Sequence, residues 1–364
     1  MTRPHYVGLM SGTSLDGVDA VLADFENGRP RLLAESHLPF SAGLRGELLA
    51  LNAPGSDEID RAARAGNELA HAYATAVAQV LARANVPASS VRAIGSHGQT
   101  VRHRPERGYT TQIGNAALLA ELTGICVVAD FRSRDVAAGG QGAPLVPAFH
   151  AAVFASATED RAALNLGGIA NLTFLPRNGA IIGFDSGPGN CLLDMWAARH
   201  LGTPCDAGGA WAASGLPDPA LLERMLQDPY FSAAPPKSTG RDLFNQGWLQ
   251  NRLRGGEDPR VVQATLLELT ARSVADAIQR HCAGARRVIA CGGGARNDAL
   301  MRRLAVLSSP AAFESSASHG IDPQLVEATA FGWLAMQTLE GRAGNLPSVT
   351  GARGPRVLGA VHHP

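Results

Sequence analysis

Two glycine-rich turns contain the residue types that bind phosphate. The first runs from residue 12 to 19 and the second from 167 to 171, and apolar β-favouring residues flank both. Glycine leaves backbone N–H groups accessible, and hydroxyl and carboxylate side chains add further partners. An ordinary tight hairpin is the alternative for either turn alone. Two such hairpins, about half a chain apart, predict two related domains that contact one nucleotide. The candidate residues are Gly12, Thr13, Ser14, Leu15, Asp16, Gly17, Val18, Asp19, Gly167, Gly168 and Asn171.

The first turn also has carboxylates suited to a metal ion. Mg²⁺ prefers oxygen ligands and keeps several of its waters, so one nearby carboxylate is enough for a phosphate-bound ion. Asp16 is our candidate for this metal site, and the sequence leaves open whether Asp16 or Asp19 lies nearer the ion.

Asp185 is the candidate general base. It follows an apolar strand and precedes Ser-Gly-Pro-Gly-Asn, so we expect it at the end of that strand. Ligands of α/β proteins usually bind at the carboxyl ends of strands, and a general base there must stay ionised near neutral pH. An Asx-turn or a helix cap is the alternative.

Further polar groups follow other predicted strands. Thr100 and Gln112 offer neutral donors and acceptors for sugar hydroxyls. Arg132 and Arg134 can bind a carboxylate or phosphate through bidentate hydrogen bonds. Surface ion pairs are the alternative for the arginines. Glu327 in the last helix is either a site residue or a first-turn acid favoured by the helix dipole.

A third glycine turn follows a strand near the end of the chain. Gly292, Gly293 and Gly294 precede a predicted helix, but Asn297 breaks the spacing of a dinucleotide-binding fingerprint. A flat glycine surface beneath an adenine and its ribose fits better than a nicotinamide cofactor.

Composition limits the class of protein. The chain has 364 residues, enough for two domains, and 32 basic residues balance 32 acidic ones, which argues against nucleic-acid binding. No apolar run is long enough for a membrane span, and the first residues do not form a secretory signal. Five cysteines without a Cys-x-x-Cys pair indicate reduced thiols, so we expect a cytoplasmic protein.

The pattern of strands and helices indicates an α/β fold with mixed sheets. Helices are expected over residues 56–85, with Ser56 as N-cap, over 116–122 and 259–281, and from about 297. Asp322 and Pro323 are expected to begin the last long helix. Residues 204–256 should form loops around short helices.

Eight segments together resemble the anhydro-N-acetylmuramic acid kinase family, in order and spacing, from Tyr6 to about Gly332. They are GLMSGTSLDGVD, GSHGQT, QIGN, DFRSRDVAAGGQGAPLVP, LNLGGIANLT, FDSGPGN, STGRDLF and CGGGARN. The resemblance implies two ribonuclease-H-like domains of the actin and hexokinase type, with mixed five-stranded sheets around a hinged ATP cleft. It implies one domain from 1–140 with about 341–364, and a second from 141–340.

The resemblance also implies an activity. ATP and Mg²⁺ would be used with water to open the anhydro bridge of 1,6-anhydro-N-acetylmuramic acid and to phosphorylate O6, in the recycling of peptidoglycan by a homodimer. Asp185 would take the proton from the attacking water. The phosphates would meet the two hairpins, and the adenosine would lie near the turn at 292–294. The sugar would be positioned by Thr100, Gln112, Arg132, Arg134 and Glu327.

Two other functions remain open from the sequence. One is an ordinary sugar or acid kinase of the same superfamily, in which Asp185 deprotonates a substrate hydroxyl rather than water. The other is an actin-like or chaperone-like ATP switch, against which the polar groups Gln99, Thr100, Gln112, Asn115 and Arg132 argue. Label from heavy-oxygen water at C1 of the sugar separates the first alternative from the anhydro-sugar reaction.

Overall fold

The computed structural model describes residues 4–12, 15–26 and 29–364. The chain divides into two compact units, Met1–Val153 with Leu325–Pro364, and Phe154–Gln324. No helix among the described residues is long and apolar enough to cross a membrane.

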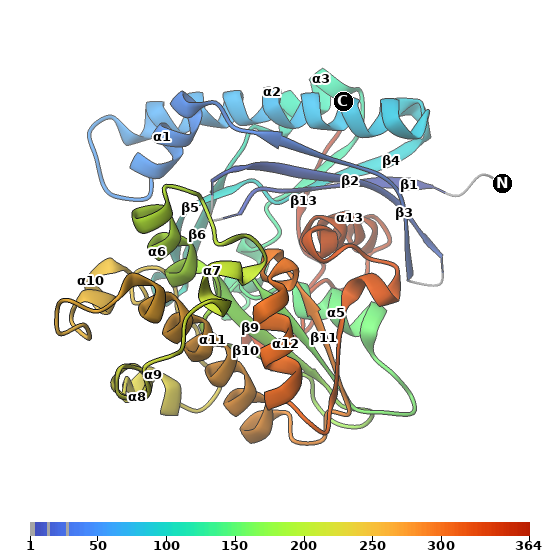
Figure 1. The fold of residues 1–364 in the computed structure, drawn as a ribbon. Helices are drawn as coiled ribbons and strands as arrows, with labels where there is room; N and C mark the ends of the chain where they lie inside the picture. The colour runs from blue at the N-terminus through green and yellow to red at the C-terminus, as the bar shows by residue number, and fades with distance from the viewer. Residues whose placement is uncertain (1–3, 13–14, 27–28) are drawn as a thin grey trace. The chain divides into compact units, whose positions relative to one another are not determined.

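The first unit is built on a mixed six-stranded sheet in the order β13-β7-β4-β1-β2-β3 (Figure 1). β1 runs antiparallel to β2 and parallel to β4. Five strands were expected, and the sixth is β13, which pairs with β7 at the edge of the sheet. The strands are β1 (His5–Met10), β2 (Gly17–Glu26), β3 (Arg29–Pro39), β4 (Val91–Ser96), β7 (Val127–Ala129) and β13 (Ala360–His362).

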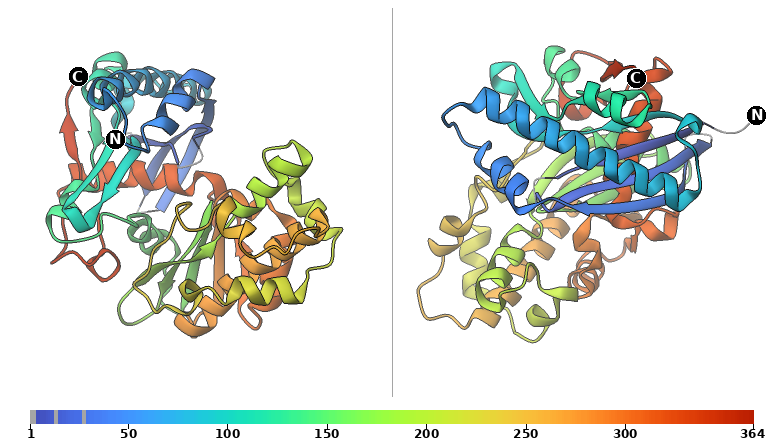
Figure 2. Two further views of the ribbon diagram at one scale, coloured as in Figure 1. Left: turned by 90° about the vertical axis from the view of Figure 1, so that its left-hand side faces the viewer. Right: turned by 90° about the horizontal axis from the view of Figure 1, so that it is seen from above.

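Helices cover both faces of this sheet. The long α2 (Glu58–Ala84) lies across β2 and β3 on one face, and α13 (Val326–Leu339) packs on β1 and β4 on the other (Figures 1 and 2). The expected helix over 56–85 is confirmed, but Asp57 rather than Ser56 occupies its N-cap position. The remaining helices of the unit are α1 (Ala42–Ala50), α3 (Ala116–Thr123), α4 (Ser133–Ala137), α5 (Val146–Phe154, whose last residue belongs to the second unit) and α14 (Pro347–Thr350).

Glycines let α13 touch the central strands. A Cβ on Gly8 of β1 would overlap the carbonyl oxygen of Ala328, and one on Gly95 of β4 would overlap that of Phe331. At these two positions backbone contacts backbone, so α13 lies directly on β1 and β4, and Glu327 adjoins the residue that contacts Gly8.

A separate hairpin, β5 (Gln99–Arg104) and β6 (Tyr109–Ile113), continues from β4. It holds Thr100 and Gln112 on neighbouring strands, since these two residues are directly paired.

The second unit is built on a mixed five-stranded sheet in the order β10-β9-β8-β11-β12. β8 is antiparallel to β9 and parallel to β11. The five expected strands are confirmed here. They are β8 (Arg161–Leu166), β9 (Ile169–Leu175), β10 (Ile182–Pro188), β11 (Arg287–Cys291) and β12 (Ala312–Ser315).

α11 (Pro259–His281) forms the centre of the second core. It has the predicted bounds because Pro259 occupies the first helical position and the Asp258 carboxylate accepts the N–H of Arg260 at 2.8 Å. α12 (Asp298–Leu307) packs beside it and is capped by Asn297. The loop-rich stretch contains short helices, as expected. These and the preceding helix are α6 (Cys191–Leu201), α7 (Ala210–Ala213), α8 (Pro219–Leu226), α9 (Pro229–Ser232) and α10 (Gln246–Gln250).

The last long helix begins later than expected. Pro323 starts a 3₁₀ turn, which the Asp322 carboxylate caps through the N–H of Gln324 at 2.9 Å, and α13 begins only at Val326. Residues 325–340 were expected in the second domain but belong to the first compact unit, in which α13 contacts β1 and β4. Residues 141–153 belong to this unit too.

Candidate active site

Gly167 and Gly168 join β8 to β9 as a two-residue turn, as predicted. The segment after β10 supports this turn: the N–H of Gly189 donates to the oxygen of Gly168 at 3.0 Å, and the N–H of Asn190 donates to that of Gly167 at 2.8 Å. A Cβ on Gly189 would overlap the Gly167 oxygen. Two of the glycine motifs therefore form one structure.

The third glycine motif packs against the same strand end. Gly292 has a φ of +82°, and a Cβ there would lie 2.8 Å from the carbonyl carbon of Leu166. A Cβ on Gly294 would lie 2.7 Å from the Leu166 Cβ. Close packing explains these two glycines, whereas Gly293 is exposed.

Asp185 lies within β10, directly opposite Asn171 of β9. The expectation that it ends its strand is wrong, because a bulge after Asp185 lets β10 continue to Pro188. The bulge sits beside the candidate base, where such irregularities often re-aim a side chain.

Residues from α9 and from the loop after it hold Asp185 in place. Its Oδ2 accepts the N–H of Thr239 at 2.9 Å, and its own N–H donates to the oxygen of Lys237 at 3.1 Å. The hydroxyl of Tyr230 donates to the backbone oxygen of Asp185 at 2.8 Å. The Lys237 ammonium donates to the backbone oxygen of Tyr230 at 3.0 Å and lies 4.6 Å from the centroid of the Tyr230 ring. Sequence reasoning assigned no role to these three residues.

Burial raises the pKa of Asp185 to about 6, while the Thr239 N–H and the Lys237 charge act in the opposite direction. The carboxylate is therefore ionised at neutral pH and yet a stronger base than an exposed aspartate, as a general base should be.

The first hairpin lies in the first unit, between β1 and β2. Thr13 and Ser14 lie outside the described residues. The backbone oxygen of Gly12 accepts from Gln99 Nε2 at 3.3 Å, and Leu15 is buried with a φ of +55°. Since the Leu15 side chain belongs to the core, any ligand contact it makes comes from its backbone.

The remaining candidates of this hairpin are Asp16, just before β2, and three residues at the start of β2. Gly17 and Val18 are buried, Asp16 is exposed, and the half-buried Asp19 has its Oδ1 2.8 Å from His37 Nδ1. The described residues include no group of three or more His, Cys, Asp or Glu side chains that could hold a metal ion.

The buried His97 and the half-buried Arg132 form a pair in the first unit. Arg132 Nη2 is 2.9 Å from His97 Nε2, and Nη1 donates to the oxygen of Gly142 at 2.8 Å. Burial lowers the pKa of Arg132 to about 10, opposed by the charges of Glu327 and Asp135, so it stays cationic at neutral pH. Burial and the Arg132 charge lower the pKa of His97 to about 3. A neutral His97 therefore accepts from a charged Arg132, and Glu327 lies near enough to act on that charge.

Asp135 is fully buried on the short helix α4. Its Oδ1 accepts from Asn345 Nδ2 at 2.6 Å and Thr350 Oγ1 at 2.8 Å, and its Oδ2 accepts the N–H of Gly142 at 2.8 Å. Gly142 in turn holds Arg132 through its oxygen. The C-terminal segment thus fixes the loop that orients Arg132.

The other sugar candidates divide into two cases. Gln112 Nε2 donates to Thr100 Oγ1 at 3.2 Å, so these two are brought together. Arg134 is exposed on α4, and among the residues that the structure describes no hydrogen bond or ion pair joins it to Arg132, Thr100 or Gln112.

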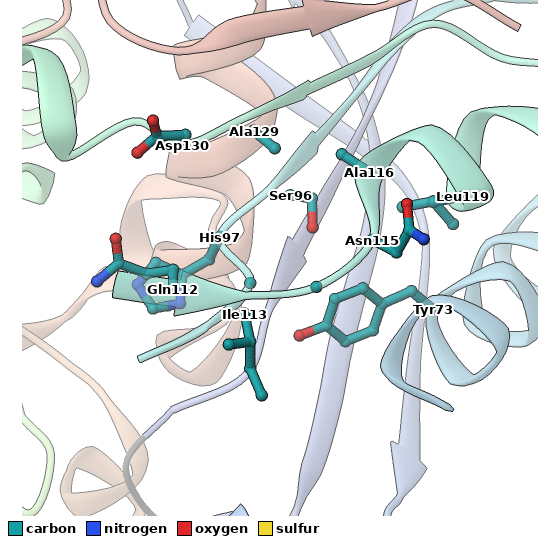
Figure 3. Close-up of a pocket in the computed structure, with 12 residues that line it drawn as sticks. Tyr73, Ser96, His97, Gln112, Ile113, Asn115, Ala116, Leu119, Ala129 and Asp130 are labelled. Carbon is teal, nitrogen blue, oxygen red and sulfur yellow. The ribbon is translucent and has the colours of Figure 1, made fainter. Parts of the chain in front are cut away.

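A small cavity of the first unit opens beside two of these groups. Figure 3 shows His97 and Gln112 on one side and the Tyr73 ring on the other. The lining combines backbone with polar and apolar side chains: Tyr73, Ser96, His97, Gly98, Gln112, Ile113, Gly114, Asn115, Ala116, Leu119, Ala129 and Asp130.

Comparison with known proteins gives matches along the whole chain. The model of the family described as anhydro-N-acetylmuramic acid kinase matches residues 4–364. A protein of Variovorax paradoxus named anhydro-N-acetylmuramic acid kinase is 57% identical over 373 residues, covering 100% of both chains. One of the same name from Nitrosospira multiformis is 54% identical over 364 residues, again over 100% of both.

A solved structure supports the fold alone. A reductive activator for a corrinoid, iron-sulfur protein superposes with a TM-score of 0.50 at 12% identity, over 96% of this chain and 63% of that one.

Proposed function

Because this chain belongs to the anhydro-N-acetylmuramic acid kinase family, with the fold of actin and hexokinase, we propose that it uses ATP and water to convert 1,6-anhydro-N-acetylmuramic acid to N-acetylmuramic acid 6-phosphate and ADP in peptidoglycan recycling. The single observation that carries the catalytic proposal is the Asp185 carboxylate, oriented by Thr239 and ionised at neutral pH.

Asp185 is the general base for the attacking water. O6 of the sugar is bonded to C1, so water adds to C1, the C1–O6 bond breaks, and O6 takes the γ-phosphoryl group as ADP leaves. The water proton passes to Asp185. Oδ2 is held by the Thr239 N–H, and Oδ1 is the oxygen that we assign to the proton.

Each hairpin supplies phosphate contacts. In the first unit these come from Gly12 to Asp19, and in the second from Gly167, Gly168 and Asn171, with adenosine near Gly292 to Gly294. The exposed carboxylate of Asp16 lies directly before the start of β2, and one such oxygen ligand suits Mg²⁺ that keeps most of its waters. When bound, this ion neutralises charge on the phosphates. Asp16 is our candidate, with Asp19 as the alternative, since Asp16 is exposed and Asp19 is half-buried.

The sugar is held by the first unit. The cationic Arg132 suits the lactyl carboxylate of the substrate, while Thr100, Gln112 and Glu327 suit its hydroxyl and amide groups. We retain Arg134 only as a peripheral contact, since it is exposed. A cytoplasmic homodimer remains part of this proposal, and sedimentation as a monomer would contradict it.

The test of function is ADP release with Mg·ATP, with and without the anhydro sugar, followed by mass spectrometry of the product. A gain of one phosphate and one water, with heavy oxygen from water at C1, supports the proposal. Phosphate gain without label at C1 would indicate an ordinary kinase, and ADP release indifferent to the sugar would indicate an ATP switch.

A pH profile tests the base directly. Since Asp185 acts when deprotonated and its pKa is about 6, kcat/KM should be level above neutral pH and fall about tenfold per pH unit below pH 6. A profile that stays level down to pH 4.5 would contradict the raised pKa of Asp185. Circular dichroism over the same pH range checks that the protein stays folded.

A further inference from the structure

Arg241 lies beside the Gly167–Gly168 turn. A Cβ built on Gly168 would lie 3.7 Å from both Nε and Nη2 of Arg241, so the guanidinium lies directly beside the backbone of Gly168. The Arg241 side chain is nevertheless exposed. It is thus placed against the turn without being buried in the core.

The loop that contains Arg241 is fixed at the catalytic carboxylate. Thr239 donates its N–H to Asp185 at 2.9 Å, and the oxygen of Lys237 accepts the N–H of Asp185 at 3.1 Å. Phe244, a few residues on, is fully buried and its N–H donates to the oxygen of Gly240 at 3.1 Å. One short segment therefore connects the candidate base to the candidate phosphate turn.

The charge of Arg241 acts on groups at the start of α6, next to the turn. Its field reaches Asp194 in the first turn of α6, where burial raises the pKa to about 6 and Arg241 opposes the rise. α6 begins at Cys191, whose N–H donates to the oxygen of Gly168 at 3.0 Å, so the positive end of this helix lies at the same turn.

The predicted phosphate turns provide no cation of their own. Residues 12–19 include two aspartates and no Lys or Arg, and residues 167–171 include no charged residue. Phosphoryl transfer relies on positioning and on cationic groups that stabilise charge on the phosphoryl oxygens.

We propose that Arg241 is a further catalytic residue, whose guanidinium binds the phosphoryl group of ATP as it passes to O6. The proposal rests on the kinase function proposed above. In the step, water bonds to C1 and gives its proton to Asp185, C1–O6 breaks, O6 bonds to the γ-phosphorus, and the bond from that phosphorus to the ADP oxygen breaks. Arg241 forms no covalent bond and transfers no proton; it binds the oxygens of the transferring group.

A variant series can separate catalysis from structure. Arg241→Ala should lower kcat by about 100-fold or more with little change in the affinity for ADP, because the lost contact is strongest in the transition state. Free guanidinium should restore part of the rate by occupying the vacated space. The kcat of Arg241→Lys should be lower than that of Arg241→Ala with added guanidinium, since one ammonium cannot replace the planar, bidentate guanidinium group. Arg254→Ala, which removes an exposed arginine of the same unit, is the matched control and should behave as wild type.

The outcomes are decisive in both directions. A kcat for Arg241→Ala near the wild-type value, or a loss that guanidinium does not restore in a protein with unchanged Tm, would overturn the catalytic role. Equal losses of ADP and ATP-analogue affinity at unchanged kcat would make Arg241 a ground-state binding residue and would also overturn it. If wild-type ADP release ignores the anhydro sugar, the proposed function fails instead, and this result is obtained without any variant.

Discussion

Asp185→Asn is expected to lower kcat by about 10²–10⁴-fold and to leave ATP binding unchanged. The amide cannot take a proton from water, but its carbonyl oxygen can still accept the N–H of Thr239, so the local geometry is kept. Sugar-dependent ADP release gives the rate, and calorimetric titration with a non-hydrolysable ATP analogue gives the affinity.

Stability provides an internal check on this variant. Burial raises the pKa of Asp185 from 3.8 to about 6, so the folded protein binds a proton more tightly than the unfolded chain. The carboxylate therefore lowers stability increasingly as the pH rises through this range, and a neutral asparagine should keep or raise the Tm at pH 7. The control variant Asp60→Asn, at a surface carboxylate that is 57% exposed, should change neither kcat nor Tm. Normal turnover by Asp185→Asn would place the base elsewhere.

Asp135→Ala should lower the free energy of unfolding by about 3–5 kcal/mol. The substitution leaves donors of Asn345, Thr350 and Gly142 buried without their acceptor, and each such group costs about 1–3 kcal/mol. Because Gly142 also holds Arg132, we expect a higher KM for the sugar as well. Urea unfolding followed by circular dichroism measures the loss.

Thr350→Val gives a graded comparison, since it removes one donor and keeps the volume of the side chain. It should cost about 1 kcal/mol. If Asp135→Ala were no more destabilising than Thr350→Val, the carboxylate would not be the centre of this network.

The local features of the chain could be predicted from the sequence. The glycine turn at 167–168 and the bounds of α11 depend on residues close to one another in sequence, such as Pro259 at the start of its helix. The six-stranded sheet could not be predicted, because β13 is too short to be recognised before its pairing with β7 is known.

The candidate site shows the same division. The residue types at Asp185 and Arg132 were sufficient to select them. Their supports were not, because Thr239 is 54 residues from Asp185, and Thr350 is 215 residues from Asp135. The position of Arg241 beside Gly168 is likewise a product of the loop's path and leaves no local signal.

The discontinuity of the first unit has a consequence for biosynthesis. The ribosome synthesises residues 154–324 before α13 and β13. The second unit therefore has all its strands while the first still exposes the face of β1 and β4 that α13 will cover. Domains fold as units during synthesis, and unprotected apolar surface is where nascent chains aggregate or recruit chaperones. The half of the molecule that is made first is therefore the half that is finished last.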